Sequence, residues 1–376
     1  MKIAIVVNSA WAAYNYRFNL ALAINRAGHE VMFIIPYDSE YSEKLKKKFQ
    51  CHNLYLDSKS LNLFKDIKTF INLLGIYKKV KPDIVCHFTI KPNIYGSIAA
   101  RVFKISSLNN ITGLGTLFIS KNFTTDVAKL LYRFSLSFSK KVFFQNTEDL
   151  NYFLQNKLIS KSKSALLPGS GVDLEKFKLS TASEHKDKFV FLLITRLLRD
   201  KGIYEYIEAI KIIKRRYSEK PIEFQVLGEV GGNNRTAIQV SELEGWVKDD
   251  LICYLGFSNQ VEKVISECDC VVLPSYREGM PRSILEAFAV GRPAIVSDVP
   301  GCRDIVEHKI NGLLCKVKSS KDLARKMITM MRISQEYRYK LSKEGRKKVE
   351  CFFDEKIVID TYIQSINNIV RHEKII

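Results

Sequence analysis

Residues 270–274 read Cys-Val-Val-Leu-Pro, and residues 277–287 read Arg-Glu-Gly-Met-Pro-Arg-Ser-Ile-Leu-Glu-Ala. The apolar run predicts a buried strand that ends at its proline, and Glu278 lies on the loop that follows. A helix is predicted to begin near Pro281, because proline suits the first helical position, and Gly291 suits its C-terminal cap. A buried strand, a loop and a helix form the repeating unit of an α/β fold, and the rest of the chain repeats this order.

The alternation of strands and helices extends over the whole chain. Apolar runs predict strands at residues 2–7, 30–36, 53–56, 83–88, 109–112, 142–145, 189–194, 223–227, 252–255, 270–274, 293–299 and 312–315. Helical spacing predicts helices at residues 11–27, 40–49, 63–80, 96–102, 125–140, 147–156 (with Thr147 as N-cap), 202–217, 238–248, 261–267, 281–289, 321–332, 336–351 and 354–376. This order predicts parallel sheets covered by helices on both faces.

Two doubly wound, Rossmann-like domains in tandem are expected for a chain of 376 residues. The polar stretch 180–188 has no periodicity and is predicted to be a linker. The domains are then residues 1–180 and 181–353, and a last helix over 354–376 is expected to cross back to the first domain. Ligands of such sheets bind at the carboxyl ends of the strands, so the two sets of loops are expected to face each other across a cleft.

The formal net charge of +19 is distributed unevenly. Residues 1–180 hold 26 Lys and Arg against 12 Asp and Glu, whereas residues 181–376 hold 33 against 28. A strongly basic half implies an anionic partner, and nucleic acid, an acidic membrane surface and a phosphorylated lipid all fit that description. The helix predicted over 125–140 mixes apolar, aromatic and basic residues, as a membrane-surface helix does and as a core helix with a basic outer face does.

The eight cysteines are scattered and form no CxxC pair. This spacing favours reduced cysteines in a cytosolic protein, and Cys268 and Cys270 have the wrong spacing for a zinc site. The first apolar run is too short for a signal peptide, and no stretch reaches the roughly 18 apolar residues that span a bilayer. Any membrane attachment is therefore expected to be peripheral.

Glu278 and Glu286 flank the start of the predicted helix, although two glutamates at such a spacing are also common on ordinary surfaces. The first N–H groups of that helix, on Arg282, Ser283 and Ile284, lie between the two carboxylates at the positive end of the helix dipole. Such a helix end binds anions, above all phosphate, while carboxylates accept hydrogen bonds from hydroxyl groups. The combination predicts a nucleotide-sugar site.

The chain resembles the family 4 retaining glycosyltransferases of the GT-B fold over almost its whole length. Residues 278–286 are similar to the family's E-x7-E motif, and residues 168–173 (Pro-Gly-Ser-Gly-Val-Asp) resemble its interdomain segment. Residues 195–202 resemble the segment that binds the donor phosphates, and residues 301–312 resemble a further glycine-bounded loop. The resemblance implies a GT-B fold.

The resemblance also implies a role for each donor residue. Arg196 and Lys201 would bind the donor diphosphate, Glu278 would contact the transferred sugar, and Glu286 would accept hydrogen bonds from the ribose. The positions implied to line the nucleotide-sugar further are Gly279, Met280, Pro281, Ser283, Ile284, Gly228 and Phe257. Cations and a helix end at the diphosphate leave no need for a metal ion, and the chain has no DxD-type acidic cluster at a strand end. Neither a metal nor a cofactor is therefore expected.

The N-terminal half is expected to hold the acceptor, with Arg17, Lys91, Asn93, Thr112 and Gly113 as candidate residues. Residues 91–96 and 111–115 resemble the "KPN.YG" and "ITGLG" segments of a bacterial subgroup that adds sugars to polyprenyl-diphosphate-linked glycans of surface polysaccharide such as O-antigen or capsule. The loop at 8–13 lacks the glycine pair that many relatives carry. His87, at a strand end, is either functional or a core histidine with satisfied hydrogen bonds.

The sequence thus predicts a retaining, metal-independent glycosyltransferase. It would move a hexose or N-acetylhexosamine from a UDP-sugar to a polyprenyl-diphosphate-linked saccharide, as a peripheral protein on the anionic inner face of the cytoplasmic membrane. A nucleotide-sugar epimerase of the same fold is one alternative. A basic nucleic-acid-binding protein is another, although the chain shows no interleaved aromatic and basic motif.

Overall fold

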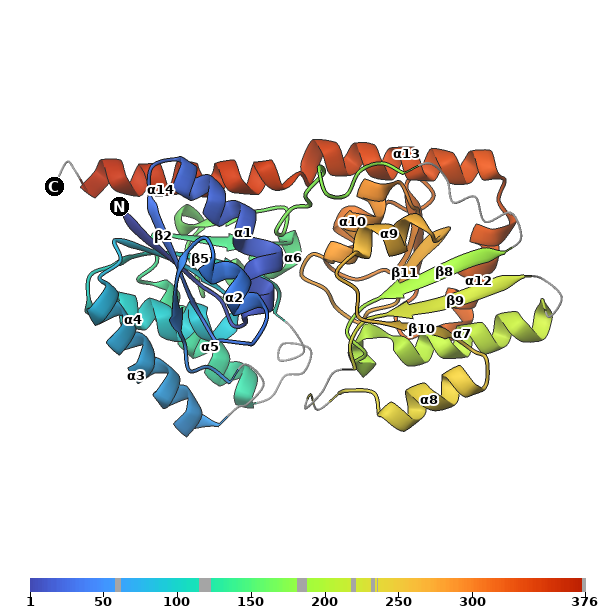
Figure 1. Cartoon of the computed structure of the whole chain (residues 1–376), viewed down its shortest axis with the longest axis horizontal. Coiled ribbons are helices and arrows are strands. Elements are labelled where there is room, and N and C mark those ends of the chain that lie inside the picture. Colours follow the sequence, from blue (N-terminus) through green and yellow to red (C-terminus); the bar gives the residue numbers. More distant parts are fainter. Residues whose placement is uncertain are drawn as a thin grey trace. The chain divides into compact units, whose positions relative to one another are not determined.

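A computed structural model of the chain contains two compact units. Unit 1 comprises Met1–Ser170 and Lys356–Ile376, and unit 2 comprises Gly171–Glu355. The structure describes residues 1–57, 62–114, 123–180, 188–217, 221–230, 234 and 236–373. In each unit a parallel sheet lies between layers of helices (Figure 1). The predicted α/β class, with two Rossmann-like doubly wound units, is confirmed.

Unit 1 contains a seven-stranded parallel sheet in the order β3-β2-β1-β4-β5-β6-β7. Its strands are β1 (Lys2–Val6), β2 (Glu30–Ile35), β3 (Gln50–Asn53), β4 (Ile84–Phe88), β5 (Ser106–Ile111), β6 (Lys141–Phe144) and β7 (Ser164–Leu166). Its helices are α1 (Ala10–Arg26), α2 (Tyr41–Lys46), α3 (Leu63–Val80), the π-helical turn η1 (Pro92–Gly96), α4 (Ser97–Val102), α5 (Phe123–Leu136), α6 (Thr147–Gln155), the 3-10 turn η3 (Lys161–Lys163) and α14 (Glu355–Glu373).

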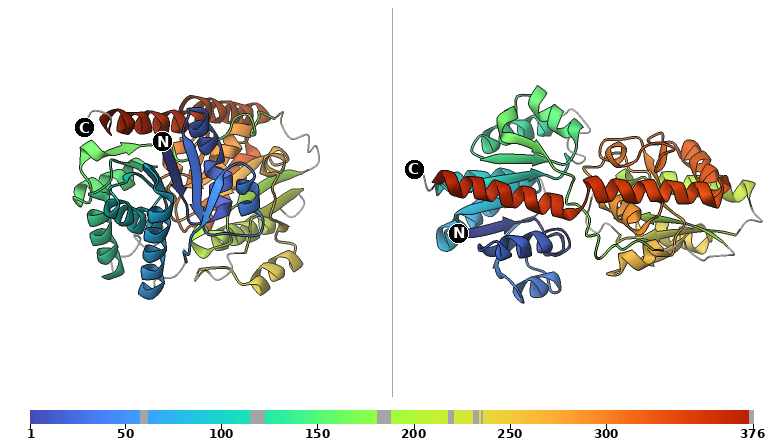
Figure 2. Two further views of the ribbon diagram at one scale, coloured as in Figure 1. Left: turned by 60° about the vertical axis from the view of Figure 1, so that its left-hand side comes forward. Right: turned by 90° about the horizontal axis from the view of Figure 1, so that it is seen from above.

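The helix α14 completes the core of unit 1, although it lies at the other end of the sequence. Its Val358, Tyr362 and Ile366 are buried in one apolar cluster with residues of β1, β4 and α1. Figure 2 shows α14, in dark red, running across the strands of this sheet. The Tyr362 side chain also accepts a hydrogen bond from Asn110 on β5 at 3.1 Å. The last segment therefore covers one face of the sheet in unit 1.

Unit 2 contains a six-stranded parallel sheet in the order β10-β9-β8-β11-β12-β13. Its strands are β8 (Phe189–Ile194), β9 (Ile222–Leu227), β10 (Cys253–Gly256), β11 (Cys270–Leu273), β12 (Ala294–Ser297) and β13 (Gly312–Cys315). Its helices are the 3-10 turn η4 (Arg199–Lys201), α7 (Ile203–Arg216), α8 (Val240–Lys248), α9 (Val261–Ser266), α10 (Arg282–Val290), α11 (Cys302–Ile305), α12 (Ser320–Arg332) and α13 (Gln335–Phe352). The central strands β8, β11 and β12 are apolar runs because both faces of the sheet are buried.

Each sheet has one point at which the strand order reverses direction. In unit 1 this point lies between β1 and β4, and in unit 2 it lies between β8 and β11. In doubly wound sheets the loops after two such strands diverge to opposite faces, and ligands bind at that carboxyl edge. The loops that follow β8 and β11 are therefore the first place to look for a site in unit 2.

The structure differs from the sequence-based element boundaries at several positions. The third strand is Gln50–Asn53 rather than residues 53–56, because β3 is an edge strand with mostly polar side chains. The N-cap of α6 is Asn146, whose Oδ1 accepts the Asp149 N–H at 2.7 Å, and not Thr147. The π-helical turn η1, the strand β7 and the short helix α11 were not expected.

The boundary between the units also differs from the predicted one at 180/181. It falls at Ser170/Gly171, because the segment that follows packs on unit 2. Val172 and Phe177 are buried in the core of unit 2, and the Ser180 N–H donates to the Val290 carbonyl at 3.1 Å. Most of the predicted linker, residues 181–187, lies outside the described residues.

Candidate functional site in unit 2

Lys201 and Glu278 meet at the point where the strand order of unit 2 reverses. Lys201 ends the 3-10 turn η4 after β8, and Glu278 lies on the loop after the neighbouring strand β11. The Lys201 Nζ donates to the Glu278 Oε1 at 2.6 Å. Their side chains are only 18% and 12% exposed. Two residues that the sequence assigned to one ligand are thus brought together as an ion pair at the carboxyl edge of the sheet.

Two glycines allow these loops to lie so close together. Gly202, at a φ of 75°, approaches the loop after β11 so tightly that an added Cβ would lie 2.1 Å from the Pro274 carbonyl oxygen. Gly301, at a φ of 77°, leaves a Cβ position only 2.4 Å from the carbonyl oxygen of Gly279. A larger residue would displace backbone in either place, since neither neighbour is a flexible side chain. The backbone that carries Glu278 is therefore held between the loops after β8 and β12.

The helix α10 begins at Arg282, with Pro281 in an extended conformation at the N-cap rather than at the first helical position. Proline offers no side-chain acceptor, so no side chain caps this helix. The Ile284 N–H donates to the Pro281 carbonyl at 3.2 Å and is not available to a ligand, contrary to the expectation. The Ser283 N–H makes no hydrogen bond with any described residue. Gly291, at a φ of 85°, caps the other end as predicted.

Glu286 lies one turn into α10, and its side chain is 12% exposed. Its Oε1 accepts a hydrogen bond from the Arg282 Nε at 2.8 Å. Burial raises the pKa of the Glu286 carboxyl, and the neighbouring Arg282 offsets only part of that effect. A partly buried carboxyl group at this place can accept hydrogen bonds from ligand hydroxyls.

The remaining donor-side candidates lie around the same edge of the sheet. Arg196 follows β8, is exposed, and forms no ion pair or side-chain hydrogen bond within the described part of the chain. Gly228, at a φ of 148°, lies against that loop, where an added Cβ would be 1.8 Å from the Thr195 carbonyl oxygen. Phe257 follows β10 and is 45% exposed, whereas Met280 packs against the core of unit 2. Of the predicted glycine-rich loop, residues 231 and 232 lie outside the described residues.

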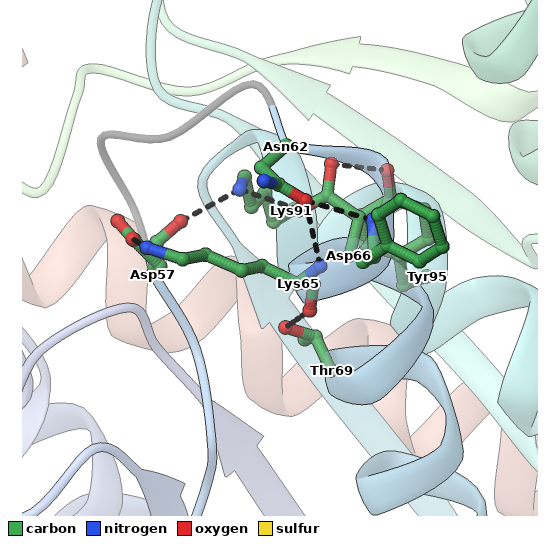
Figure 3. A network of polar contacts seen from close by, with 8 residues as sticks. Asp57, Asn62, Lys65, Asp66, Thr69, Lys91 and Tyr95 are labelled. Atoms are coloured by element: carbon green, nitrogen blue, oxygen red, sulfur yellow. Dashed lines mark hydrogen bonds and ion pairs between the residues drawn. The ribbon is translucent and has the colours of Figure 1, made fainter.

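In unit 1 the predicted acceptor residue Lys91 is held inside a polar network (Figure 3). Its Nζ donates to the Asp66 Oδ1 at 2.5 Å and to the Asp57 carbonyl at 2.6 Å, and its side chain is 13% exposed. Tyr95 donates to the other Asp66 oxygen at 3.0 Å, and Lys65 pairs with the Asp57 carboxylate at 2.8 Å. Lys91 thus ties the end of the loop after β3 to α3. Sequence reasoning missed Asp66 and Tyr95, because no local pattern signals a contact between residues so far apart in the chain.

Two other acceptor candidates are also buried. Arg17 on α1 is 4% exposed, and its guanidinium group lies 4.0 Å from the centre of the Phe88 ring. Asn93 is fully buried, and its Nδ2 donates to the Asn110 carbonyl at 2.8 Å. The Asn93 Oδ1 finds no partner among the described residues. Arg17 lies on a helix, as predicted, whereas Asn93 lies in the π-helical turn η1 and not on a loop.

Thr112 and Gly113 follow β5 at the carboxyl edge of unit 1 and are both half-buried. Gly113 has a φ of 128°, which favours glycine. Gly115, the last residue of the predicted segment, lies outside the described residues. This pair is the part of the acceptor prediction that lies on an accessible loop.

His87 is a core histidine. Its Nε2 lies 2.8 Å from the Tyr77 hydroxyl, and its Nδ1 lies 2.7 Å from the Asn109 Oδ1. The Asn109 amide nitrogen donates to two serine hydroxyls, and its Oδ1 faces His87; in this arrangement the His87 Nδ1 donates to Asn109 and the Nε2 accepts from Tyr77. Burial lowers the pKa of His87 to about 4. Both ring nitrogens are satisfied inside unit 1.

Within the described residues no cluster of three or more His, Cys, Asp or Glu side chains could hold a metal ion. All eight cysteines are free thiols. In the same residues no helix has both the length and the hydropathy needed to cross a bilayer.

Two family models together match most of the chain. Residues 175–348 match the "Glycosyl transferases group 1" family, and residues 2–146 match the "Glycosyl transferase 4-like" family. The matched segments correspond to the sheet of unit 2 and to most of the sheet of unit 1.

Curated relatives carry glycosyltransferase names. The N,N'-diacetylbacillosaminyl-diphospho-undecaprenol alpha-1,3-N-acetylgalactosaminyltransferase of Campylobacter jejuni is 28% identical over 99% of this chain and 100% of its own length. An Escherichia coli UDP-Gal:alpha-D-GlcNAc-diphosphoundecaprenol alpha-1,3-galactosyltransferase is 28% identical over 69% of each chain. The capsular polysaccharide biosynthesis glycosyltransferase CapM of Staphylococcus aureus is 24% identical over 90% of this chain and 88% of its own.

Solved structures share the fold. The Anabaena protein HepE, in complex with UDP and glucose, matches with a TM-score of 0.79 at 18% identity over 98% of this chain and 100% of its own. Sucrose-phosphate synthase of Thermosynechococcus elongatus matches with a TM-score of 0.81 at 17% identity over 99% of this chain and 100% of its own. With its two doubly wound units and these matches, the chain is a glycosyltransferase of the GT-B fold, in which residues 175–348 belong to the group 1 family and residues 2–146 to the 4-like family.

Proposed function

We propose that this glycosyltransferase is retaining and metal-independent, and that it moves a hexose or N-acetylhexosamine from a UDP-sugar to a polyprenyl-diphosphate-linked saccharide. The observation that carries the donor assignment is the Lys201–Glu278 ion pair at the reversal point of the unit 2 sheet, directly before the uncapped helix α10. A cation, a carboxylate and a helix N-terminus at one sheet edge match the phosphate and hydroxyl groups of a nucleotide-sugar.

The donor diphosphate is assigned to Lys201, Arg196 and the Ser283 N–H. An ammonium group has three donors, so Lys201 can bind a phosphate oxygen while it keeps its bond to Glu278. The exposed Arg196 guanidinium suits bidentate binding of a phosphate. Lys201 and the Ser283 N–H are held in position at the place where the leaving diphosphate gains negative charge, and Arg196 adds a further positive charge there. Together these groups would stabilise the transition state as a metal ion otherwise does. The two cations and the helix N–H group therefore support the proposal of a metal-independent reaction.

The sugar and the ribose are assigned to the two glutamates. Only the Oε1 of Glu278 is engaged by a described residue, which leaves the Oε2 for a hydroxyl group of the transferred sugar. Glu286 would accept hydrogen bonds from the ribose hydroxyls, and the Gly279–Pro281 backbone lies between the two glutamates in sequence. Gly228 and the exposed Phe257 would border the base, on the loops after β9 and β10.

Retention of configuration follows if the acceptor attacks on the face from which the diphosphate leaves. The bond from the anomeric carbon to the phosphate oxygen breaks as the bond to the acceptor oxygen forms on the same face. The departing phosphate oxygen takes the proton of the acceptor hydroxyl, so that UDP itself is the base. Lys201 and Arg196 hold the phosphate during this step, and Glu278 holds the sugar.

The acceptor is assigned to unit 1, at the carboxyl edge of its sheet, where the half-buried Thr112 and Gly113 follow β5. Support for its chemistry comes from the relatives in C. jejuni and E. coli, whose names specify undecaprenol-linked diphosphate acceptors and α-1,3 products. The E. coli relative is named for UDP-Gal, and the HepE structure contains UDP, which supports a uridine nucleotide. Such an acceptor would bring the chain to the anionic inner face of the cytoplasmic membrane.

A donor screen tests this function. Purified protein is incubated with radiolabelled UDP- and GDP-sugars and a synthetic polyprenyl-diphosphate-linked N-acetylhexosamine, with and without EDTA. We expect label from one UDP-sugar to enter the lipid-linked product at the same rate in EDTA. Epimerised or hydrolysed UDP-sugar without any labelled lipid product would contradict the proposal, and so would loss of transfer in EDTA that Mg²⁺ restores.

A further inference from the structure

A basic cavity opens at the amino-terminal edge of the unit 1 sheet, on the edge opposite to the loops discussed above. It has a volume of about 490 Å³ and lies between α4, the start of β5 and the chain that joins α5 to β6. Four cations line it: Arg101, Lys104, Lys140 and Lys163. The hydroxyl-bearing residues Ser97, Ser106 and Ser139, all buried, form its inner wall.

The four cations are not neutralised by the protein. Among the described residues, no carboxylate forms an ion pair with any of them, and residues 97–141 contain Asp126 as their one acidic residue. Two of the four are held in place. Lys163 donates to the Ser137 carbonyl at 2.5 Å, and the Arg101 guanidinium lies 5.6 Å from the centre of the Phe138 ring. Concentrated positive charge beside serine hydroxyls is an arrangement suited to a phosphate group.

An exposed apolar stripe on α5 leads to this cavity. Val127, Leu130 and Phe134 are 40%, 68% and 53% exposed, and their spacing places them on one side of the helix. The Phe134 ring contacts the ring of Phe138, which lines the cavity, at a centroid distance of 5.0 Å. Val102, beside Arg101 on α4, is 60% exposed as well. The cavity and the stripe thus form one surface, which we call the α4–α5 face.

We propose that the α4–α5 face docks the protein on an anionic bilayer, with a phospholipid phosphate in the cavity and the apolar stripe among the acyl chains near the headgroups. A free phosphate ion would use the cations but would give the exposed Leu130 and Phe134 no partner, whereas a lipid matches both parts of the face. This inference goes beyond the proposed function, which requires a membrane-linked acceptor but assigns no surface to the membrane.

Vesicle sedimentation of the full chain, without any donor or acceptor, tests the docking face. We expect binding to vesicles that contain phosphatidylglycerol and little binding to pure phosphatidylcholine. Because each basic residue near an anionic surface strengthens binding about fivefold, Lys104→Gln/Lys140→Gln should weaken it by about 25-fold. The matched control Lys343→Gln/Lys347→Gln removes the same charge from an exposed face of α13 and should leave vesicle binding unchanged.

A second variant separates the lipid from other anions. Leu130→Ser/Phe134→Ser keeps all four cations, and it should abolish the part of vesicle binding that survives high salt. The proposal would be overturned if the cavity variant and the α13 control lost vesicle binding equally. It would also be overturned if single-stranded RNA or free glycerophosphate bound the cavity while vesicle binding stayed intact in the cavity variant and in Leu130→Ser/Phe134→Ser. Transfer to a water-soluble acceptor analogue should be unaffected in every variant, so failure of the docking face and failure of the proposed function are distinguishable.

Discussion

In the Lys201–Glu278 ion pair, two residues of the candidate ligand site hold each other in position. Each group is mostly shielded from water, and an isolated charge in that position would be costly. The two side chains satisfy each other across neighbouring loops, and both retain capacity for further hydrogen bonds. The ion pair therefore positions both side chains and leaves each of them able to form hydrogen bonds with a ligand.

Replacement of either residue should lower the rate of transfer strongly. We expect Lys201→Ala and Glu278→Gln each to lower kcat by a factor of about 100 to 1,000, because each removes a fixed group at the reacting centre. The control Lys211→Ala removes an exposed ion pair with Glu208 on the nearby helix α7 and should keep full activity. Steady-state kinetics on the purified variants give the answer, and wild-type rates in either site variant would disprove the assignment.

His87 makes the stability of unit 1 depend on pH. Its pKa is about 4 in the folded chain and near 6.5 when unfolded, so between these values only the unfolded state binds the proton. The stability that neutral His87 contributes is complete above pH 6.5 and is lost as the pH falls towards 4. Between pH 7 and pH 5 this amounts to about 2 kcal/mol.

Hydrogen exchange of the β4 and β5 amides measures this effect locally. Between pH 7 and pH 5 the opening free energy of wild-type unit 1 should fall more steeply than that of His87→Gln, which keeps a donor and an acceptor but does not titrate. Parallel pH dependence in the two proteins would show that His87 is not buried in its neutral form.

At the scale of elements, we expect stability and activity to depend more on a glycine where two loops cross than on a glycine inside a helix. Gly301→Ala should force the Gly279 backbone away and lower both the melting temperature and kcat/KM, the latter more than tenfold. In Gly245→Ala, within α8, the added Cβ has open space and should stabilise the chain by about 0.5–1 kcal/mol. Thermal unfolding and kinetics of the two variants compare them directly. An active Gly301→Ala protein of normal stability would contradict the described contact.

Most elements could be predicted from the sequence because their patterns are local. The helix predicted over 63–80 matches α3, where Asn62 caps the first turn, and the apolar runs at 189–194 and 312–315 match β8 and β13. The predicted third strand began too late in the chain, because Gln50–Asn53 has little apolar content and the apolar Leu54 comes directly after it. Local patterns thus locate central strands better than edge strands.

The site was predictable only in part, for a related reason. The order of strands and loops placed Lys201 and Glu278 at one sheet edge, but their pairing depends on a contact between residues 77 positions apart. The burial of the acceptor candidates Lys91, Arg17 and Asn93 could not be predicted, because nothing in their local sequence reveals that Asp66, Phe88 or Asn110 lies beside them. Loop position could be inferred from the sequence, whereas side-chain exposure could not.

At the scale of the whole molecule, the charge distribution agrees with the division of work that we propose. The excess positive charge lies in residues 1–180, which form most of unit 1, where the lipid-linked acceptor and the α4–α5 face are assigned. Residues 181–376 carry far less net charge, and Arg196 and Lys201 follow β8 at the reversal point of the unit 2 sheet. A donor site needs a few fixed charges, whereas a membrane surface is bound by many.

The anomeric configuration of the product tests the central claim most directly. The purified protein is given the UDP-sugar that it accepts, together with a polyprenyl-diphosphate-linked saccharide, and the new glycosidic bond is examined by NMR spectroscopy. The account predicts a lipid-linked product in which the transferred sugar keeps the α configuration that it has in the UDP-sugar. A β-linked product, or release of UDP without any lipid-linked product, would contradict it.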